Sequence, residues 1–156
     1  MAGLVSGAPS DLDGRLRRIE DRLEIADLIA RYGPAVDAGS GDAVAALWTV
    51  DGEYAFDDAV LTGPEIADVV DHPTHRRLMA AGCAHVLSPP RIDLDGDRAT
   101  VVHHSIVLES IGGAWTPVRV SANRWLFVRT PGGWRACHRS NRLLTGSDEA
   151  RALLAP

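Results

Sequence analysis

The sequence predicts an α+β fold in which helices come first and long antiparallel strands follow. Apolar residues recur at helical spacing from residue 11 to about residue 70, and they alternate with period two from about residue 83 onward. Glycine-rich turn signals separate the strand-like runs. This order is typical of a curved sheet with helices packed on one face.

The first helix is predicted over residues 11–38. Ser10 or Asp11 is suited to cap its start, and Gly39 is suited to end it. Pro34 lies inside the pattern, where it removes a backbone hydrogen bond, so we expect a bent helix or two helices. The apolar stripe of this segment begins with Leu12, Leu16, Ile19 and Leu23 and continues with Ile25, Leu28, Ile29, Tyr32 and Val36.

Shorter elements are predicted next. Asp42 can cap a helix that carries Val44, Leu47 and Trp48, and residues 51–56 then form a turn and a short strand. Thr62 and Glu65 have the spacing of a capping box, so a helix is expected over residues 64–70. Residues 72–82 form a further short helix or an irregular linker.

Four strand-like runs make up the second half of the chain. They are rich in Val, Ile and Trp and cover residues 84–87, 91–110, 115–130 and 132–144. Turn signals lie at residues 95–97, 111–113 and 130–133. The runs therefore predict an antiparallel meander.

Length and composition indicate one small domain. The 156 residues carry a net charge of −5, and basic residues are scattered, which disfavours nucleic acid or an anionic membrane as partner. We expect a flexible tail over residues 1–10, one domain over 11–146 and a C-terminal tail over 147–156 that forms a weak helix. Without a signal-peptide pattern, and with Cys83 and Cys137 expected as free thiols, the chain is predicted to be cytoplasmic.

Six histidines raise the question of a metal site. None of them shows the paired spacing of zinc ligands, and adjacent residues such as His103 and His104 point to opposite faces of a strand. The sequence also has no phosphate-binding glycine loop and no nucleophile elbow. We therefore predict neither a metal nor a cofactor.

Carboxylate–imidazole chemistry remains as a hypothesis. Asp37 ends an apolar helix and His85 begins an apolar strand. A carboxylate that binds one imidazole nitrogen fixes the tautomer and makes the other nitrogen a better base. The alternative is that Asp37 is a helix-end residue and His85 a buried structural histidine.

Residues 25–54 and 85–108 resemble the SnoaL-like branch of the nuclear-transport-factor-2-like superfamily, and with the last strand the similarity covers residues 15–143. The resemblance implies an α+β cone, a strongly bent sheet wrapped around helices with a pocket at its wide end. Ketosteroid isomerase, scytalone dehydratase, limonene epoxide hydrolase and polyketide cyclases share this fold, so the fold alone does not fix the reaction.

One subgroup, which includes scytalone dehydratase, hexachlorocyclohexane dehydrochlorinase and bile-acid 7α-dehydratase, is more similar. Tyr32, Asp37 and His85 have the separations of five and 48 residues seen in the bile-acid enzyme, and Arg91 also has a counterpart. The resemblance implies that His85 is the base, that Asp37 orients it and that Tyr32 donates a hydrogen bond. Scytalone dehydratase has a second catalytic histidine, but the matching position in this sequence lies close to Glu109, so that histidine is not reproduced. On an ideal helix Tyr32 and Asp37 point about 140° apart, so distortion near Pro34 or Gly39 is required.

Strand alternation predicts further pocket residues. Aligned with the family, the central strand directs His103, Ser105 and Val107 inward and His104, Ile106 and Leu108 away. Inward candidates on the last two strands are Asn123 and His138. Trp48, Tyr54 and Trp125 belong to the core or contact the substrate.

These expectations lead to a cofactor-independent lyase or isomerase, dehydratase-like, for a hydrophobic and cyclic substrate. A non-catalytic binding or accessory protein is the first alternative, and a polyketide cyclase or hydrolase the second. The resemblance also implies a homo-oligomer, a dimer or trimer, assembled through the outer face of the sheet and its stripe of Val102, His104, Ile106 and Leu108.

Overall fold

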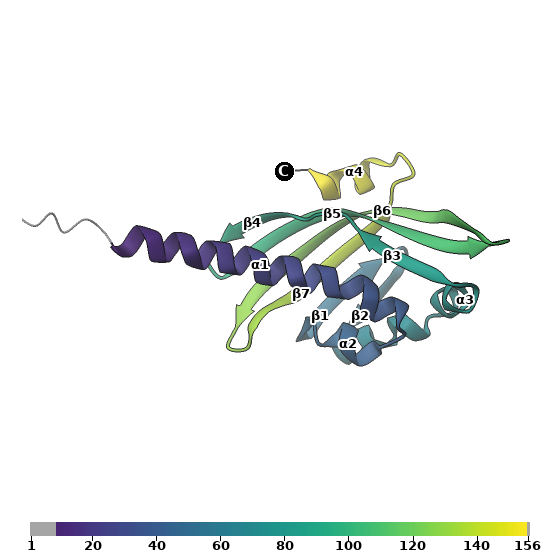
Figure 1. The fold of residues 1–156 in the computed structure, drawn as a ribbon, viewed down its shortest axis with the longest axis horizontal. Helices are drawn as coiled ribbons and strands as arrows, with labels where there is room; N and C mark the ends of the chain where they lie inside the picture. The colour runs from purple at the N-terminus through teal and green to yellow at the C-terminus, as the bar shows by residue number, and fades with distance from the viewer. Residues whose placement is uncertain (1–8, 156) are drawn as a thin grey trace, which may run out of the picture.

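The computed structural model describes residues 9–155 and confirms the α+β prediction (Figure 1). The expected tail over residues 1–10 lies largely outside this part of the chain. The helices are α1 (Pro9–Asp37), α2 (Gly41–Ala45), the 3-10 helix η1 (Gly63–Asp71), α3 (Pro73–Ala81) and α4 (Asp148–Leu154). The strands are β1 (Trp48–Phe56), β2 (Ala59–Thr62), β3 (Cys83–Leu87), β4 (Arg91–Asp95), β5 (Arg98–Ile111), β6 (Ala114–Thr130) and β7 (Gly133–Leu143).

The strands form one curved sheet in the order β2-β1-β7-β6-β5-β3, with β4 also paired to β5. The pairs are antiparallel except β1 with β7, which run parallel. Helix α1 crosses the concave face of the sheet, and α4 lies on the other face (Figure 1). The site therefore forms between α1 and the concave face.

Helix α1 is longer than expected and is one continuous helix rather than two. It begins at Pro9, before both predicted caps, because a proline has no N–H that the first helical turn would leave unpaired. It continues through Pro34 and ends at Asp37, and Gly39 follows with a positive φ of 66°. Within residues 9–155 no helix is both long and apolar enough to span a bilayer.

The shorter helices differ from the predictions in detail. Ser40, not Asp42, caps α2, and its hydroxyl accepts a hydrogen bond from the Ala43 N–H. The capping box is present, because the Glu65 carboxylate accepts hydrogen bonds from the Thr62 N–H and hydroxyl. The helix that follows is a 3-10 helix.

Residues 148–154, placed in the expected C-terminal tail, form α4 on the outer face of the sheet. Ala150 is fully buried there, and the Arg124 guanidinium donates hydrogen bonds to the Leu153 and Ala155 carbonyls. Helix α4 contacts β5, β6 and β7, and Val102 is buried beneath this region, whereas Ile106 on the same face of β5 stays partly exposed. Part of the stripe expected to form an oligomer contact is thus not free.

Candidate active site

Asp37 and His85 are in direct contact. The Asp37 Oδ1 lies 2.6 Å from the His85 Nδ1, and the Asp37 Oδ2 accepts the backbone N–H of His85 at 2.8 Å. The contact to Oδ1 assigns the ring hydrogen to Nδ1 and leaves the lone pair on Nε2. Among the described residues, Nε2 has no hydrogen-bond partner, so it is available to a ligand.

The local sequence brings the two residues together. Asp37 is the last residue of α1, and His85 lies in β3, where it pairs with Val107 of β5. At the crossing of α1 and β3 stands Gly33, where a Cβ would lie only 2.3 Å from the His85 carbonyl oxygen. Only glycine permits this close approach, and the approach sets the distance between helix and strand.

The contacts of Asp37 favour its carboxylate form. Burial raises the pKa of Asp37, but hydrogen bonds from the His85 ring, the His85 backbone and the Cys83 thiol outweigh it, and the net pKa is lowered. Burial and the neighbouring Asp37 charge raise the pKa of the Cys83 thiol to about 11. Asp37 is therefore ionised at neutral pH while Cys83 keeps its proton.

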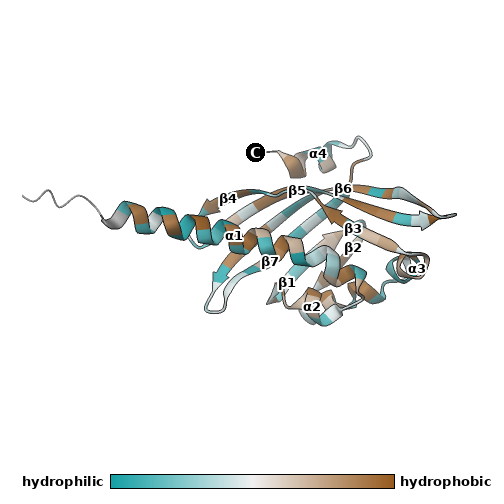
Figure 2. Cartoon of the chain, in the orientation of Figure 1, coloured by the Kyte–Doolittle hydropathy of each residue, from teal (hydrophilic) through white to brown (hydrophobic). Residues whose placement is uncertain are grey.

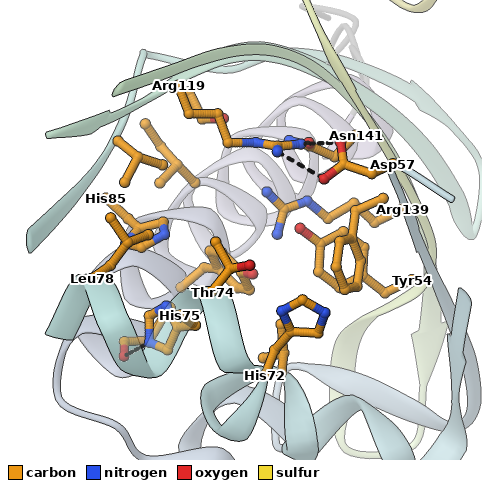
Figure 3. Close-up of a pocket in the computed structure, with 17 residues that line it drawn as sticks. Tyr54, Asp57, His72, Thr74, His75, Leu78, His85, Arg119, Arg139 and Asn141 are labelled. Carbon is orange, nitrogen blue, oxygen red and sulfur yellow. Dashed lines mark hydrogen bonds and ion pairs between the residues drawn. The ribbon is translucent and has the colours of Figure 1, made fainter. Parts of the chain in front are cut away.

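His85 borders a cavity of about 120 Å³. A water molecule needs roughly 10–15 Å³ on the same measure, so the cavity admits a larger ligand. Its lining combines helix α1, the β1–β2 turn, α3 and the concave face of the sheet (Figure 3). The lining residues are Tyr32, Val36, Tyr54, Phe56, Asp57, Val69, His72, Thr74, His75, Leu78, His85, Leu87, Ser105, Val107, Arg119, Arg139 and Asn141.

Tyr32 lines this cavity, whereas Asp37 does not. Tyr32 lines it directly and packs edge-on against Tyr54 and Trp125. Asp37 points to β3 and acts on the cavity only through His85. Their divergent directions on α1 are thus compatible with a shared site, and Pro34 lies inside one continuous helix.

Arg139 is the cavity residue that sequence reasoning missed. It is 2% exposed, and its guanidinium carbon lies 4.2 Å, 4.4 Å and 4.3 Å from the ring centroids of Tyr32, Tyr54 and Trp125. Its Nε and Nη2 donate to Asn123 Oδ1, but Nη1 has no partner within residues 9–155. Figure 3 shows the guanidinium directed into the cavity. The site therefore contains a fixed positive charge with a donor to spare.

A β-bulge explains why this residue was missed. The β6–β7 register shifts between Leu126, which faces His138, and Phe127, which faces Ala136, so Cys137 is an extra residue. After the bulge Arg139 points inward, and His138 lies on the other face beside Glu53 and Ser140. His138 does not line the cavity. Residues on both faces of this strand are polar, so hydrophobic alternation could not reveal the shift.

The other predicted substrate contacts divide into two groups. Tyr54 and Ser105 line the cavity. Asn123 is fully buried behind it, where it donates to Ser105 Oγ at 2.9 Å and accepts from Arg139. Asn123 thus positions two lining residues, whereas Trp48 is buried in the core outside the lining.

His103 faces inward, as predicted, but it is enclosed. Its Nδ1 donates to the His104 carbonyl at 2.9 Å, and its Nε2 accepts from Trp125 Nε1 at 2.8 Å. Burial, above all, lowers the pKa of His103 to about 4. It is a neutral histidine that holds Trp125 in place and does not line the cavity. His104 is exposed on the outer face.

His75 and the Arg119–Asp57 ion pair also line the cavity and were not predicted. The His75 Nε2 donates to the Val36 carbonyl at 2.9 Å, and its ring centroid lies 5.3 Å from that of His85. Burial and His85 lower the pKa of His75. Arg119 makes a two-point ion pair with Asp57 in the β1–β2 turn and holds the pKa of that carboxyl low.

Asp37, Cys83 and His85 place possible ligand atoms within 4.8 Å of one another. Asp37 Oδ1 is already bonded to the His85 ring, and the thiol pKa of about 11 keeps the proton on Cys83. A metal ligand must be deprotonated. A cation at this cluster would have to displace the proton of Cys83 and the contact between Asp37 and the His85 ring.

The chain is similar in sequence and structure to known proteins. A family model described as a SnoaL-like domain matches residues 17–140. The crystal structure of an NTF2-like protein with a cystatin-like fold from Novosphingobium aromaticivorans is 50% identical, with a TM-score of 0.93 over 97% of this chain and 99% of that chain.

More distant structures share the fold. Hexachlorocyclohexane dehydrochlorinase LinA-type3 from Novosphingobium barchaimii LL02 is 21% identical, with a TM-score of 0.72 over 83% of this chain and 90% of that chain. No curated protein matches the chain. The family model and the half-identical structure together show that the chain belongs to the SnoaL-like domain family of NTF2-like proteins.

Proposed function

We propose that the protein is a cofactor-independent lyase or isomerase that removes a proton from carbon in a small, hydrophobic, cyclic substrate. The observation that carries the proposal is the 2.6 Å contact between Asp37 and His85 Nδ1, with Nε2 facing a cavity. The fold is shared with an enzyme named for the dehydrochlorination of hexachlorocyclohexane, at 21% identity.

In the proposed elimination, the His85 Nε2 takes the proton and the C–H electron pair forms the new double bond. The bond to the leaving group breaks, and that group departs as hydroxide or halide, which the imidazolium or solvent can then protonate. Asp37 stabilises the imidazolium, since the charged pair is held in one hydrogen bond. In an isomerisation the imidazolium instead returns the proton to another carbon.

Charge that develops on the substrate meets Arg139 and Tyr32. The free Nη1 of Arg139 can donate to an enolate oxygen or a departing anion. Aromatic rings surround the guanidinium and exclude water from it, which strengthens its interaction with an anion. We assign the Tyr32 hydroxyl as a second donor.

The test uses two kinds of substrate, a panel of cyclic β-hydroxy ketones and a nitrobenzisoxazole, whose ring opens when a base takes its one acidic C–H proton. His85→Ala and Asp37→Asn should each lower kcat/KM by about 10²–10⁴-fold. His104→Ala, an exposed histidine on β5, is the matched control and should retain activity.

Other outcomes separate the alternatives. Full activity in either dyad variant would refute the proposal. Loss of activity in Asp37→Asn with His85→Ala tolerated would favour a cyclase that uses the aspartate alone. A ligand that binds all variants equally, with no product formed, would point to a binding protein.

A further inference from the structure

The apolar residues of α1 occupy two different faces of the helix. In the C-terminal half, Ile25, Leu28, Ile29, Tyr32 and Val36 are buried against the sheet. In the N-terminal half, the exposed fractions are 67% for Leu12, 52% for Leu16, 55% for Ile19 and 66% for Leu23. We call these four residues the α1 stripe.

The α1 stripe points away from the domain to which it belongs. At about 100° per residue, its members fall within an arc of about 60°, and the centre of this arc lies about 160° from that of the buried face. The helix also extends past the edge of the sheet, and apolar bands (brown in Figure 2) recur along this projecting part. No described element of the same chain covers the stripe, although a patch of large apolar side chains usually has a partner.

The spacing of the stripe is that of a coiled coil. Its members are four, three and four residues apart, as a and d positions of a heptad are. With Leu16 and Leu23 at a, Arg15 occupies a g position and Asp13 and Glu20 occupy e positions. Two heptads are short for an isolated coiled coil, but here the C-terminal half of α1 is already held by the fold, so no helix needs to be nucleated.

The flanking charges select the partner. Arg15 and Arg22 lie along one side of the stripe, and Asp13 and Glu20 along the other. In a parallel pair each g residue faces the e residue five positions later in its partner, which joins Arg15 to Glu20. In an antiparallel pair, g faces g and e faces e, which would place arginine against arginine and carboxylate against carboxylate.

We propose that two copies of this chain associate through the α1 stripe as a short parallel coiled coil. Arg15, Asp13 and Glu20 are exposed and form no ion pair within residues 9–155, so they are free to make these contacts. Each domain lies on the far side of its own helix, which keeps the two domains apart in this arrangement. The interface is separate from the outer face of the sheet and independent of the catalytic proposal.

Sedimentation velocity of the full chain tests the proposal. The wild-type chain should sediment as a dimer or a larger multiple, and Leu16→Glu with Ile19→Glu should halve that mass while the circular dichroism spectrum remains that of the folded chain. Ile106→Glu with Val120→Glu is the matched control, since these are exposed apolar residues on the outer face of β5 and β6. The control should leave association through the stripe intact.

The orientation is tested by charge exchange. Arg15→Glu alone should weaken association, because it sets carboxylates against each other, and adding Glu20→Arg should restore it. A wild-type chain that stays monomeric up to its solubility limit, or an unchanged mass in the stripe variant, overturns the proposal. So does binding of the monomer to lipid vesicles through the stripe. Failure of the double exchange to restore association overturns the parallel arrangement.

Discussion

The Asp37 carboxylate contacts His85 twice, with one oxygen on the imidazole Nδ1 and the other on the backbone N–H of the same residue. One side chain thus fixes both the ring of His85 and the strand that carries it. The pair can therefore be probed through two separate readouts, stability and turnover.

Asp37→Ala and Asp37→Asn should differ in these readouts. The alanine variant leaves the His85 N–H without an acceptor, so we expect a loss of about 1–3 kcal/mol in the free energy of unfolding. The asparagine variant keeps an oxygen acceptor and should lose less stability, but both variants should lose turnover. Urea unfolding beside kcat/KM checks this, and equal stability of the two variants would contradict the two-point contact.

Gly33→Ala should disturb the site through the backbone. The added Cβ would lie 2.3 Å from the His85 carbonyl oxygen, so α1 and β3 must separate. We expect a destabilisation of about 1–3 kcal/mol and a fall in kcat/KM, because Asp37 moves away from His85.

Gly14→Ala is the control for this change. Gly14 also lies in α1, where an added Cβ meets no atom within 4 Å, and alanine there should stabilise the helix by about 0.5–1 kcal/mol. If Gly33→Ala behaves like Gly14→Ala, the close approach does not set the geometry of the site.

Arg139→Met should separate activity from stability. The guanidinium pairs with no carboxylate within residues 9–155, so its removal strands no buried anion, and a methionine can fill the space between the rings. We expect kcat/KM to fall by about 10²–10³-fold with little change in urea unfolding. Arg139→Lys, which keeps the charge, should retain more activity, and an equal loss in both variants would argue that shape alone matters.

His103 should make the protein sensitive to mild acid. Its pKa is about 4 in the folded chain, whereas an unfolded histidine titrates near ~6.5. Between these values the unfolded chain binds the proton and the folded chain does not, so the free energy of unfolding should fall as pH is lowered through this window, by on the order of 3 kcal/mol.

His103→Gln should flatten this dependence, since glutamine can still accept the hydrogen bond of Trp125 but does not titrate. The slope will not vanish, because burial lowers the pKa of His75 in the same direction. Chemical unfolding at a series of pH values provides the measurement. His104→Gln on the exposed face is the control and should keep the wild-type slope.

Much of the fold could be predicted because the chain changes period. Helical spacing before residue 70 and alternation after residue 83 marked nearly every long element. Asp37 and His85 were found because their separation matches that of a similar enzyme, and their contact depends only on a helix end that meets a strand. Hydrophobic spacing identified α1, and at about 100° per residue it also places Leu16 and Ile29 about 140° apart on the helix. Only the position of the sheet shows which of these two faces is buried.

Arg139 could not be predicted for a different reason. Alternation along a strand fixes direction only while the register is regular, and the bulge at Cys137 resets it. The thiol of Cys137 donates to the Leu126 carbonyl at 3.4 Å, where the regular ladder is interrupted. No residue type in this segment indicates the shift in register.

That bulge also decides the chemical character of the cavity. If β7 paired with β6 along its whole length without the extra residue, the same sequence would direct His138 inward and expose Arg139 to solvent. The cavity wall would then carry an imidazole in place of the guanidinium. A relative that keeps these residues but lacks the bulge would therefore present a different side chain to an anion in the cavity.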